Sequence, residues 1–253
     1  MSARFRTTFL ILFALTLTGI AFGQQTAEQL VGSGQVKVET GDWDGAIADF
    51  TKAIELNPKY DFAYVSRGVI KRHKGDLDGA VTDFTKAIEV NPRNSTAYAQ
   101  RGHAKVSKGD LDGAIADYSK TIELNPRVPV AYLSRGEVKK AKGDQAGAIE
   151  DFFSGEMAKG DMGGISGNPN GAIVDYTRAI ELHPKDANAY FKRGVAKVKK
   201  GDLDGALADY SKAIELDPKH AEAYLGRGNA KKTKGDQMGA DEDFAQAAKL
   251  QGH

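Results

Sequence analysis

The sequence predicts an all-α protein, a right-handed superhelical solenoid of antiparallel helix pairs with about six and a half repeats. The first observation is a period of 34 residues, which separates Pro58 from Pro92 and Pro126, and Pro184 from Pro218. The second is that apolar residues within each period recur mostly at three- and four-residue steps. The third is that Gly-Asp pairs divide each period in two. A period of this length indicates one supersecondary unit per repeat, stacked on its neighbours.

The segment 109–126 shows why each unit is helical. Asp110 or Asp112 can accept hydrogen bonds from the free N–H groups at the start of a helix, and Asn125-Pro126 ends it. The preceding Gly109 allows the chain to turn back from an earlier helix. The residues of the buried face are Leu111, Ala114, Ile115, Tyr118, Ile122 and Leu124. Each repeat is therefore predicted to be a hairpin of two antiparallel helices.

These motifs resemble the tetratricopeptide repeat, with Tyr in the place usually held by Trp. The pattern reads Tyr64, Arg67-Gly68, Lys71, Ala80, Phe84 and Pro92. Counting the first residue of each repeat as position 1, repeats begin at Ala27, Asp61, Ser95, Pro129, Ala187 and Ala221. The resemblance implies that partner proteins or peptide segments bind along a concave face formed by the first helices.

One fault interrupts the array, because Pro126 and Pro184 are 58 residues apart, ten short of two periods. Residues 27–154 form four predicted repeats. Residues 155–170, which are rich in glycine, are predicted to form an irregular, flexible joint that replaces a first helix. Residues 171–253 supply the second helix of a truncated repeat and two full repeats. This gives six first helices and seven second helices.

The N-terminus differs from the repeats. Arg4 and Arg6 precede an apolar run over residues 9–22, which ends in Ala21-Phe22-Gly23. This pattern is typical of a secretory signal peptide over residues 1–23. An uncleaved membrane anchor is the alternative, but the run is shorter than the roughly 20 residues that a span needs. We therefore expect an exported protein, periplasmic or secreted, with no stable membrane span after cleavage.

Composition excludes several functions. The chain of 253 residues has no cysteine, which excludes disulfides, thiolate metal sites and a cysteine nucleophile. Its 35 Lys and Arg nearly balance 34 Asp and Glu, so no net field favours nucleic acid.

No catalytic, metal or cofactor site is predicted. The Asp110-Leu111-Asp112-Gly113 motif lacks the ligand order of a calcium loop, so a turn and helix cap is the preferred interpretation. The glycines of 160–171 lack the Gly-Lys-Ser/Thr end of a phosphate loop. The five histidines share no metal-ligand spacing. The protein is therefore predicted not to be an enzyme.

A repeated Arg/Asp pattern carries more information. Position 7 is arginine in five repeats: Arg67, Arg101, Arg135, Arg193 and Arg227. Position 23 is aspartate in every second helix: Asp49, Asp83, Asp117, Asp151, Asp175, Asp209 and Asp243. Partly buried arginines need acidic partners, so structural ion pairs are predicted, within a repeat or with the preceding one. The alternative is that these arginines bind an anionic ligand.

Positions 2, 5, 9 and 12 form a second stripe on each first helix, and the resemblance places this stripe on the concave face. Apolar residues in a row beside positive charge are typical of a contact surface. The alternative is that position 5 packs against the next repeat. The hypothetical groove residues are Val65, Val69, Arg72, Ala99, His103, Val106, Leu133, Lys140, Phe191, Val195, Val198, Leu225, Asn229 and Lys232.

The function predicted from these observations is a scaffold or adaptor for a protein or peptide partner. The stripe lacks Lys at position 5 with Asn at position 9, the pair that binds free C-terminal carboxylates in the family it resembles. We therefore expect it to bind a segment with apolar and acidic residues. The alternative is an accessory or regulatory subunit of enzymatic or polysaccharide machinery in the cell envelope.

Overall fold

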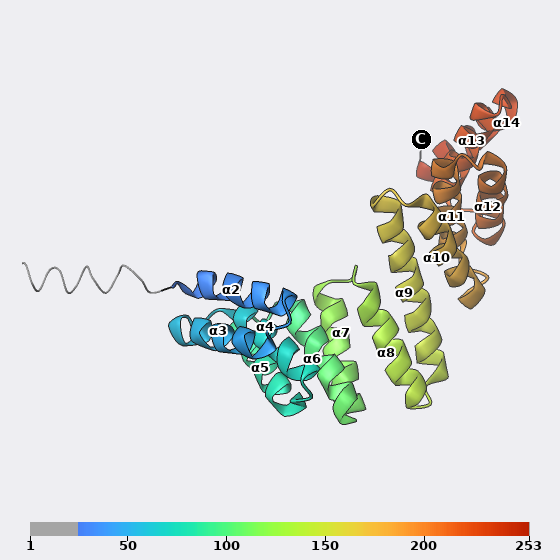
Figure 1. Cartoon of the computed structure of the whole chain (residues 1–253). Coiled ribbons are helices and arrows are strands. Elements are labelled where there is room, and N and C mark those ends of the chain that lie inside the picture. The colour runs from blue at the N-terminus through green and yellow to red at the C-terminus, as the bar shows by residue number, and fades with distance from the viewer. Residues whose placement is uncertain (1–24, 253) are drawn as a thin grey trace, which may run out of the picture. The chain divides into compact units, whose positions relative to one another are not determined.

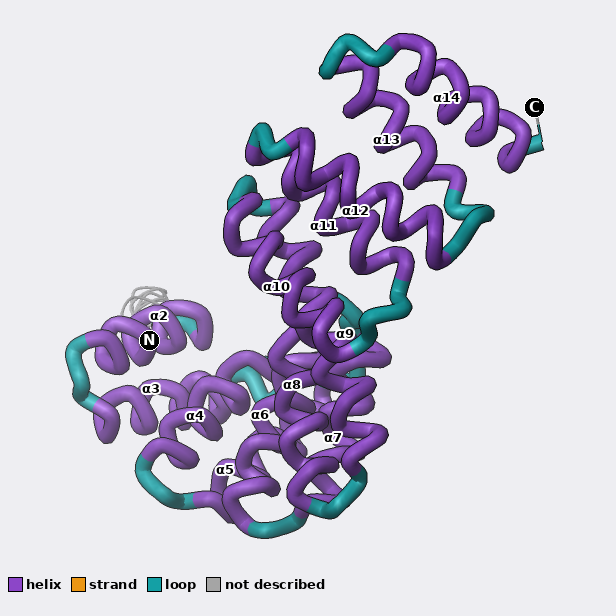
Figure 2. Tube along the Cα trace, turned by 90° about the vertical axis from the view of Figure 1, so that its right-hand side faces the viewer, coloured by secondary structure: helices purple, strands orange, loops and turns teal. Residues whose placement is uncertain are grey.

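The computed structural model describes residues 25–252, and in this part of the chain all regular structure is helical (Figures 1 and 2). The chain divides into two units, Met1–Ala104 and Lys105–His253. The first unit contains α2 (Ala27–Glu39), α3 (Trp43–Leu56), α4 (Asp61–His73), α5 (Leu77–Val90) and most of α6 (Ser95–Lys108). The second contains α7 (Leu111–Leu124), α8 (Pro129–Ala141), α9 (Gln145–Ile165), α10 (Pro169–Leu182), α11 (Ala187–Lys200), α12 (Leu203–Leu216), α13 (Ala221–Thr233) and α14 (Gln237–Gln251).

These 13 helices of the described residues form sequential antiparallel pairs in an array of about six repeats, which confirms the predicted fold class. The signal peptide predicted over residues 1–23 lies outside the described residues. Between residues 25 and 252, none of the helices combines the length and the hydropathy that crossing a bilayer requires.

The turn inside each hairpin follows from two residues. Gly75 has φ of +87°, a left-handed conformation that a glycine adopts without strain. The side chain of Asp76 then caps the next helix, because its Oδ1 accepts a hydrogen bond from the Gly79 N–H at 2.9 Å. The other second helices are capped in the same way by Asp42, Asp110, Asp144, Asn168, Asp202 and Asp236.

Within each hairpin the two helices approach closely at a glycine. A Cβ atom on Gly68 would lie 2.8 Å from the ring of Phe84, sixteen residues later. Phe84 is completely buried, so position 8 must be small for position 24 to fill the core. The same Gly and aromatic pair recurs in Gly34 with Phe50, Gly136 with Phe152, Gly194 with Tyr210, and Gly228 with Phe244.

The prediction of an irregular joint at 155–170 was wrong. Helix α9 continues without a break to Ile165, and only residues 166–168 separate it from α10. Figure 1 shows α9 as a longer helix between α8 and α10. The glycines of this segment are compatible with a helix because tertiary packing on both sides supports it.

The second half of α9 is itself a first helix in the family register. Gly160 packs against Tyr176, sixteen residues later, as position 8 does against position 24 elsewhere. Gly167 has φ of +74°, as at position 15, and Asn168 takes the place of the capping Asp. A repeat therefore begins at residue 153, and the ten missing residues fuse the second helix of one repeat with the first helix of the next. We call residues 153–186 the fused repeat.

Candidate functional site

The Arg/Asp motif forms a network inside each hairpin. Arg193 donates hydrogen bonds from Nε and Nη2 to the two carboxylate oxygens of Asp209, at 2.9 and 2.7 Å. Lys197, at position 11, lies 2.8 Å from the same carboxylate. Because Asp209 is buried, these two cations satisfy a charge that water does not reach.

Within the described residues the same arginine geometry recurs in other repeats. The arginine pairs are Arg67 with Asp83, Arg135 with Asp151, and Arg227 with Asp243. The pairs made by position 11 are Lys37 with Asp49, Lys71 with Asp83, Lys105 with Asp117, Lys139 with Asp151, and Lys231 with Asp243. These arginines bind the aspartate of their own repeat, which answers the question that the sequence left open.

Each arginine also contacts the repeat before it. Arg193 Nη1 donates to Thr177 Oγ1 of the preceding repeat at 3.2 Å. Its guanidinium also lies 5.5 Å from the ring centroid of Tyr190, three residues earlier on the same helix. Equivalent hydroxyl contacts join Arg67 to Thr51, Arg101 to Thr85, Arg135 to Ser119 and Arg227 to Ser211. The position 7 arginines therefore hold the register between repeats.

The charged network shifts the pKa of its members. Burial alone would raise the pKa of Asp151, but the hydrogen bonds from Arg135 and Lys139 outweigh it and lower that pKa. The hydrogen bond to Asp209 raises the pKa of Arg193. Both shifts favour the charged forms.

Two of the seven aspartates differ from the others. Asp49 belongs to the first repeat, where Ser33 stands at position 7 and donates to its carboxylate at 2.6 Å. Asp175 belongs to the fused repeat, where position 7 is Lys159 and position 11 is Gly163. Burial, together with the nearby charge of Glu156, raises the pKa of Asp175.

The hypothetical groove residues differ in exposure. The prediction that Val65 binds a partner is wrong, since this residue is 7% exposed and packs in a core with Ala80, Phe84 and Ala97. Here the alternative, that position 5 packs against the next repeat, is correct, since the same core includes Ala97 of the repeat that begins at Ser95. Exposed residues are Val106, Lys140, Val198, Asn229 and Lys232, and half-buried residues are Val69, Arg72, Ala99, His103, Leu133, Phe191, Val195 and Leu225.

In the first unit, Arg72 and His103 lie close enough to interact. Burial and the positive charge of Arg72 together lower the pKa of His103. The imidazole is therefore neutral near pH 7 and does not add to a positive surface there.

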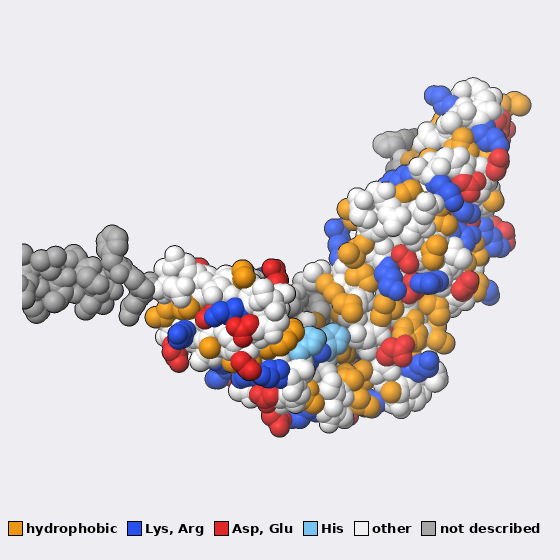
Figure 3. Space-filling view, viewed as in Figure 1, with side chains coloured by type: hydrophobic (Ala, Val, Ile, Leu, Met, Phe, Trp, Pro, Cys, Tyr) orange, Lys and Arg blue, Asp and Glu red, His pale blue; other side chains and the backbone are white. Residues whose placement is uncertain are grey.

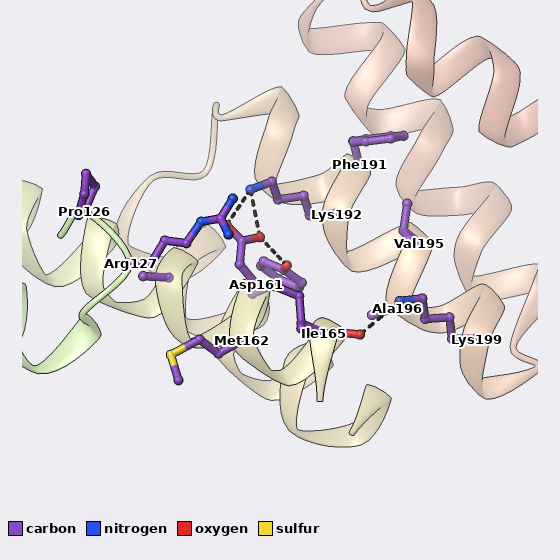
Figure 4. A pocket seen from close by; sticks show the side chains of 13 residues that line it. Pro126, Arg127, Asp161, Met162, Ile165, Phe191, Lys192, Val195, Ala196 and Lys199 are labelled. Atoms are coloured by element: carbon purple, nitrogen blue, oxygen red, sulfur yellow. Dashed lines mark hydrogen bonds and ion pairs between the residues drawn. The ribbon is translucent and has the colours of Figure 1, made fainter. Parts of the chain in front are cut away.

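In the second unit, Phe191 and Val195 line a cleft of about 540 Å³ between the second half of α9 and α11 (Figure 4). The second half of α9 contributes Met162 and Ile165 to the lining, and their exposed fractions are 51% and 76%. Pro126 and Arg127, from the loop before α8, complete the lining. This cleft, which we call the α9–α11 cleft, therefore presents apolar side chains to solvent.

Charges in the α9–α11 cleft are mainly positive. Lys192 Nζ lies 2.8 Å from each carboxylate oxygen of Asp161, and Tyr176 donates its hydroxyl to Asp161 at 2.7 Å. Lys199 donates to the carbonyl of Gly164 at 3.0 Å. Arg127, Lys192 and Lys199 outnumber the single carboxylate of Asp161, so the cleft favours an anionic group.

One face of the second unit carries charges of both signs. Figure 3 shows Lys and Arg interspersed with Asp and Glu over the visible face of the second unit. Among the described residues, no group of three or more His, Cys, Asp or Glu is arranged to hold a metal ion. The α9–α11 cleft therefore offers shape, apolar contact and charge, which are the features of a binding site.

Sequence reasoning missed Asp161, Met162 and Ile165 because it treated 155–170 as a loop. A signal was available in the sixteen-residue spacing of Gly160 and Tyr176, which equals that of Gly68 and Phe84. The role of the position 11 lysines was also missed, although they recur in every regular repeat.

The fold defines a helical-hairpin repeat protein. Models of the TPR repeat match residues 102–143, 165–201 and 196–235, and a tetratricopeptide repeat model matches residues 32–98. The chain belongs to the tetratricopeptide repeat family. A comparison with curated proteins found no match.

Solved structures of the same kind are similar to this chain. A tetratricopeptide repeat protein from Parabacteroides merdae is 22% identical, with a TM-score of 0.49, over 90% of this chain and 94% of that one. YrrB, a TPR protein with an unusual peptide-binding site, is 25% identical, with a TM-score of 0.37, over 80% and 92%. The TPR2AB domain of yeast Sti1, in a complex with pHSP90, is 25% identical, with a TM-score of 0.43, over 88% and 90%.

Proposed function

We propose that this protein is an exported interaction scaffold that binds a segment of a partner protein in the α9–α11 cleft. The observation that carries the proposal is the exposed apolar lining of a cleft of about 540 Å³, to which α9 contributes Met162 and Ile165 and α11 contributes Phe191 and Val195. Apolar side chains that converge on a cleft in this way are typical of a contact surface.

The charges suggest the chemistry of the partner. Apolar side chains of the segment would pack on Phe191 and Ile165, and acidic side chains would lie near Arg127 and Lys199. Positions 5 and 9 of α11 are Phe191 and Val195, not the Lys and Asn that bind a C-terminal carboxylate. The partner segment is therefore internal, with apolar anchors beside acidic residues.

The test is to replace Ile165 with Asp and to measure which proteins of the native source the purified chain captures. Ile165 is 76% exposed, so the substitution leaves the fold intact, while it places a negative charge in a cleft that favours anions. We expect capture to fall at least about tenfold. The matched control is Met238→Asp, because Met238 on α14 is 77% exposed and lies outside the cleft. Equal capture by both variants would refute the proposal.

Export is supported by the sequence of residues 1–23 and is tested separately. Mass spectrometry of the protein isolated from its native source should show a chain that begins at Gln24. A chain that keeps Met1 would count against export and would leave the binding site unaffected.

A further inference from the structure

Glu156 carries a charge at a position where the other repeats have an apolar or aromatic side chain. In the fused repeat it stands at position 4, which is Tyr or Leu in all other repeats. Counted as part of the preceding second helix it stands at position 28, where five other second helices have Ile. A buried carboxylate at such a place costs stability unless something binds it.

The carboxylate of Glu156 is only half satisfied. Glu156 is 9% exposed, and its Oε1 accepts a hydrogen bond from Lys159 Nζ at 2.8 Å. Its Oε2 is buried and has no hydrogen-bond partner. Buried polar atoms are nearly always bonded, so an unsatisfied oxygen of this kind requires an explanation.

The fused repeat also lacks positive charge. Regular repeats place an arginine and a lysine around one aspartate. Here Lys159 is the cation at position 7, while two carboxylates, Glu156 and Asp175, lie within its neighbourhood. With Arg178, which also acts on Asp175, the fused repeat has two cations for two carboxylates, whereas a regular repeat has two cations for one.

A pocket of about 540 Å³ opens beside Glu156, between α8, α9 and α10. Its polar residues are Glu137, Glu156, Glu181 and Arg178, so three acidic residues and one arginine line it. Its apolar walls are Leu133, Phe152 and Leu182. We call this the Glu156 pocket; it shares no lining residue with the α9–α11 cleft.

We propose that the Glu156 pocket binds an arginine side chain of a partner protein, with Glu156 Oε2 as the buried acceptor and Glu137 and Glu181 at the rim. The apolar walls suit the aliphatic stem, and the ring of Phe152 suits the planar guanidinium. The protein already uses this chemistry internally, since Arg193 binds the buried Asp209 through two donors. In the Glu156 pocket the arginine comes from outside.

The experiment uses the acetylated, amidated tripeptide Ala-Arg-Ala and its citrulline counterpart, which has the same shape without the charge. In an NMR titration of the full exported chain, the arginine peptide should shift the amide signals of 152–156 and 178–182, with an affinity on the order of millimolar. The citrulline peptide should bind at least about tenfold more weakly. Equal binding of the two peptides would overturn the proposal.

Two variants make the test specific. Glu156→Gln keeps the shape of the side chain and should weaken arginine binding at least about tenfold, whereas Glu215→Gln, on the exposed face of α12, should leave it unchanged. Glu137→Lys places a resident cation at the rim and should abolish binding without lowering the melting temperature, because Glu137 is exposed. Unchanged binding in either pocket variant would refute the assignment. Ile165→Asp should still bind the peptide, so failure of the cleft and failure of this pocket are distinguishable.

Discussion

The regular repeat of α11 and α12 and the fused repeat share their packing geometry and differ in their charges. Both place a glycine against a tyrosine sixteen residues later, in Gly194 with Tyr210 and Gly160 with Tyr176. Both turn through a glycine with positive φ and a capping side chain. The regular repeat places Arg193 and Lys197 around Asp209. The fused repeat has Lys159 in place of the arginine and Gly163 in place of the lysine.

This difference separates two roles that the sequence pattern combines. Small and aromatic residues at positions 8 and 24, with the glycine and cap of the turn, are sufficient to form a hairpin. The Arg and Lys network is an addition that sets contacts between repeats. Where it is missing, the fused repeat exposes Met162 and leaves Glu156 half satisfied. The two candidate binding sites therefore lie where the repeat rule is broken, as is common for functional sites.

The largest difference is expected when the same aspartate is changed in the two repeats. Asp209→Asn leaves Arg193 and Lys197, both largely buried, without a counter-charge and should lower the free energy of unfolding by about 3 kcal/mol. Asp175→Asn should not lower the free energy of unfolding, because no hydrogen bond or ion pair to Asp175 forms within the described residues. Chemical denaturation of both variants measures this. Similar losses at the two sites would show that the fused repeat has an ion pair after all.

Glycine substitutions test whether the fused repeat keeps the packing rule. A Cβ atom at Gly160 would overlap with the ring of Tyr176, so Gly160→Ala should cost about 2 kcal/mol. Gly164, one turn later in α9, has no neighbour within 4 Å, so Gly164→Ala should stabilise the helix by about 1 kcal/mol. Thermal denaturation distinguishes the two. Stabilisation by both substitutions would mean that residues 153–165 do not pack as a first helix.

Much of the fold could be predicted from the sequence because its signals are local and repeated. The spacing of Pro58 and Pro92, the apolar stripe of 111–124 and the Gly-Asp turns each report on one hairpin. The fused helix was missed because helix propensity, which glycine lowers, was given more weight than register. Packing against Leu133 and Tyr176 overrides that propensity, and packing is a tertiary property.

The candidate sites were less predictable than the fold. Phe191 and Val195 were found because they follow the family stripe, but their exposure depends on what faces them across the cleft. Val65 follows the same stripe and is buried. The unsatisfied Oε2 of Glu156 depends on the packing of three helices at once, so no local pattern in the sequence reports it.

The smallest expected effect is a pH dependence of opposite sign in the two kinds of repeat. The pKa of Asp151 is lowered by its cations, so its contribution to stability is present above its usual value of 3.8 and is lost as the pH falls through its folded pKa. The pKa of Asp175 is raised by burial and by Glu156, so the folded chain holds that proton more tightly than the unfolded chain. Stability should therefore fall as the pH rises from 3.8 through the folded pKa of Asp175.

Asp175→Asn removes this penalty and should stabilise the protein at neutral pH by less than about 1 kcal/mol, since solvent screens this partly exposed group. Asp151→Asn should destabilise the protein at neutral pH, and both differences from the wild type should vanish well below pH 3.8, where the carboxyls are protonated. The measurement is the free energy of unfolding from about pH 2.5 to about pH 7, a range over which unfolding must be reversible. A loss of stability at neutral pH in Asp175→Asn would show that this carboxylate is paired, and that the fused repeat is electrostatically regular.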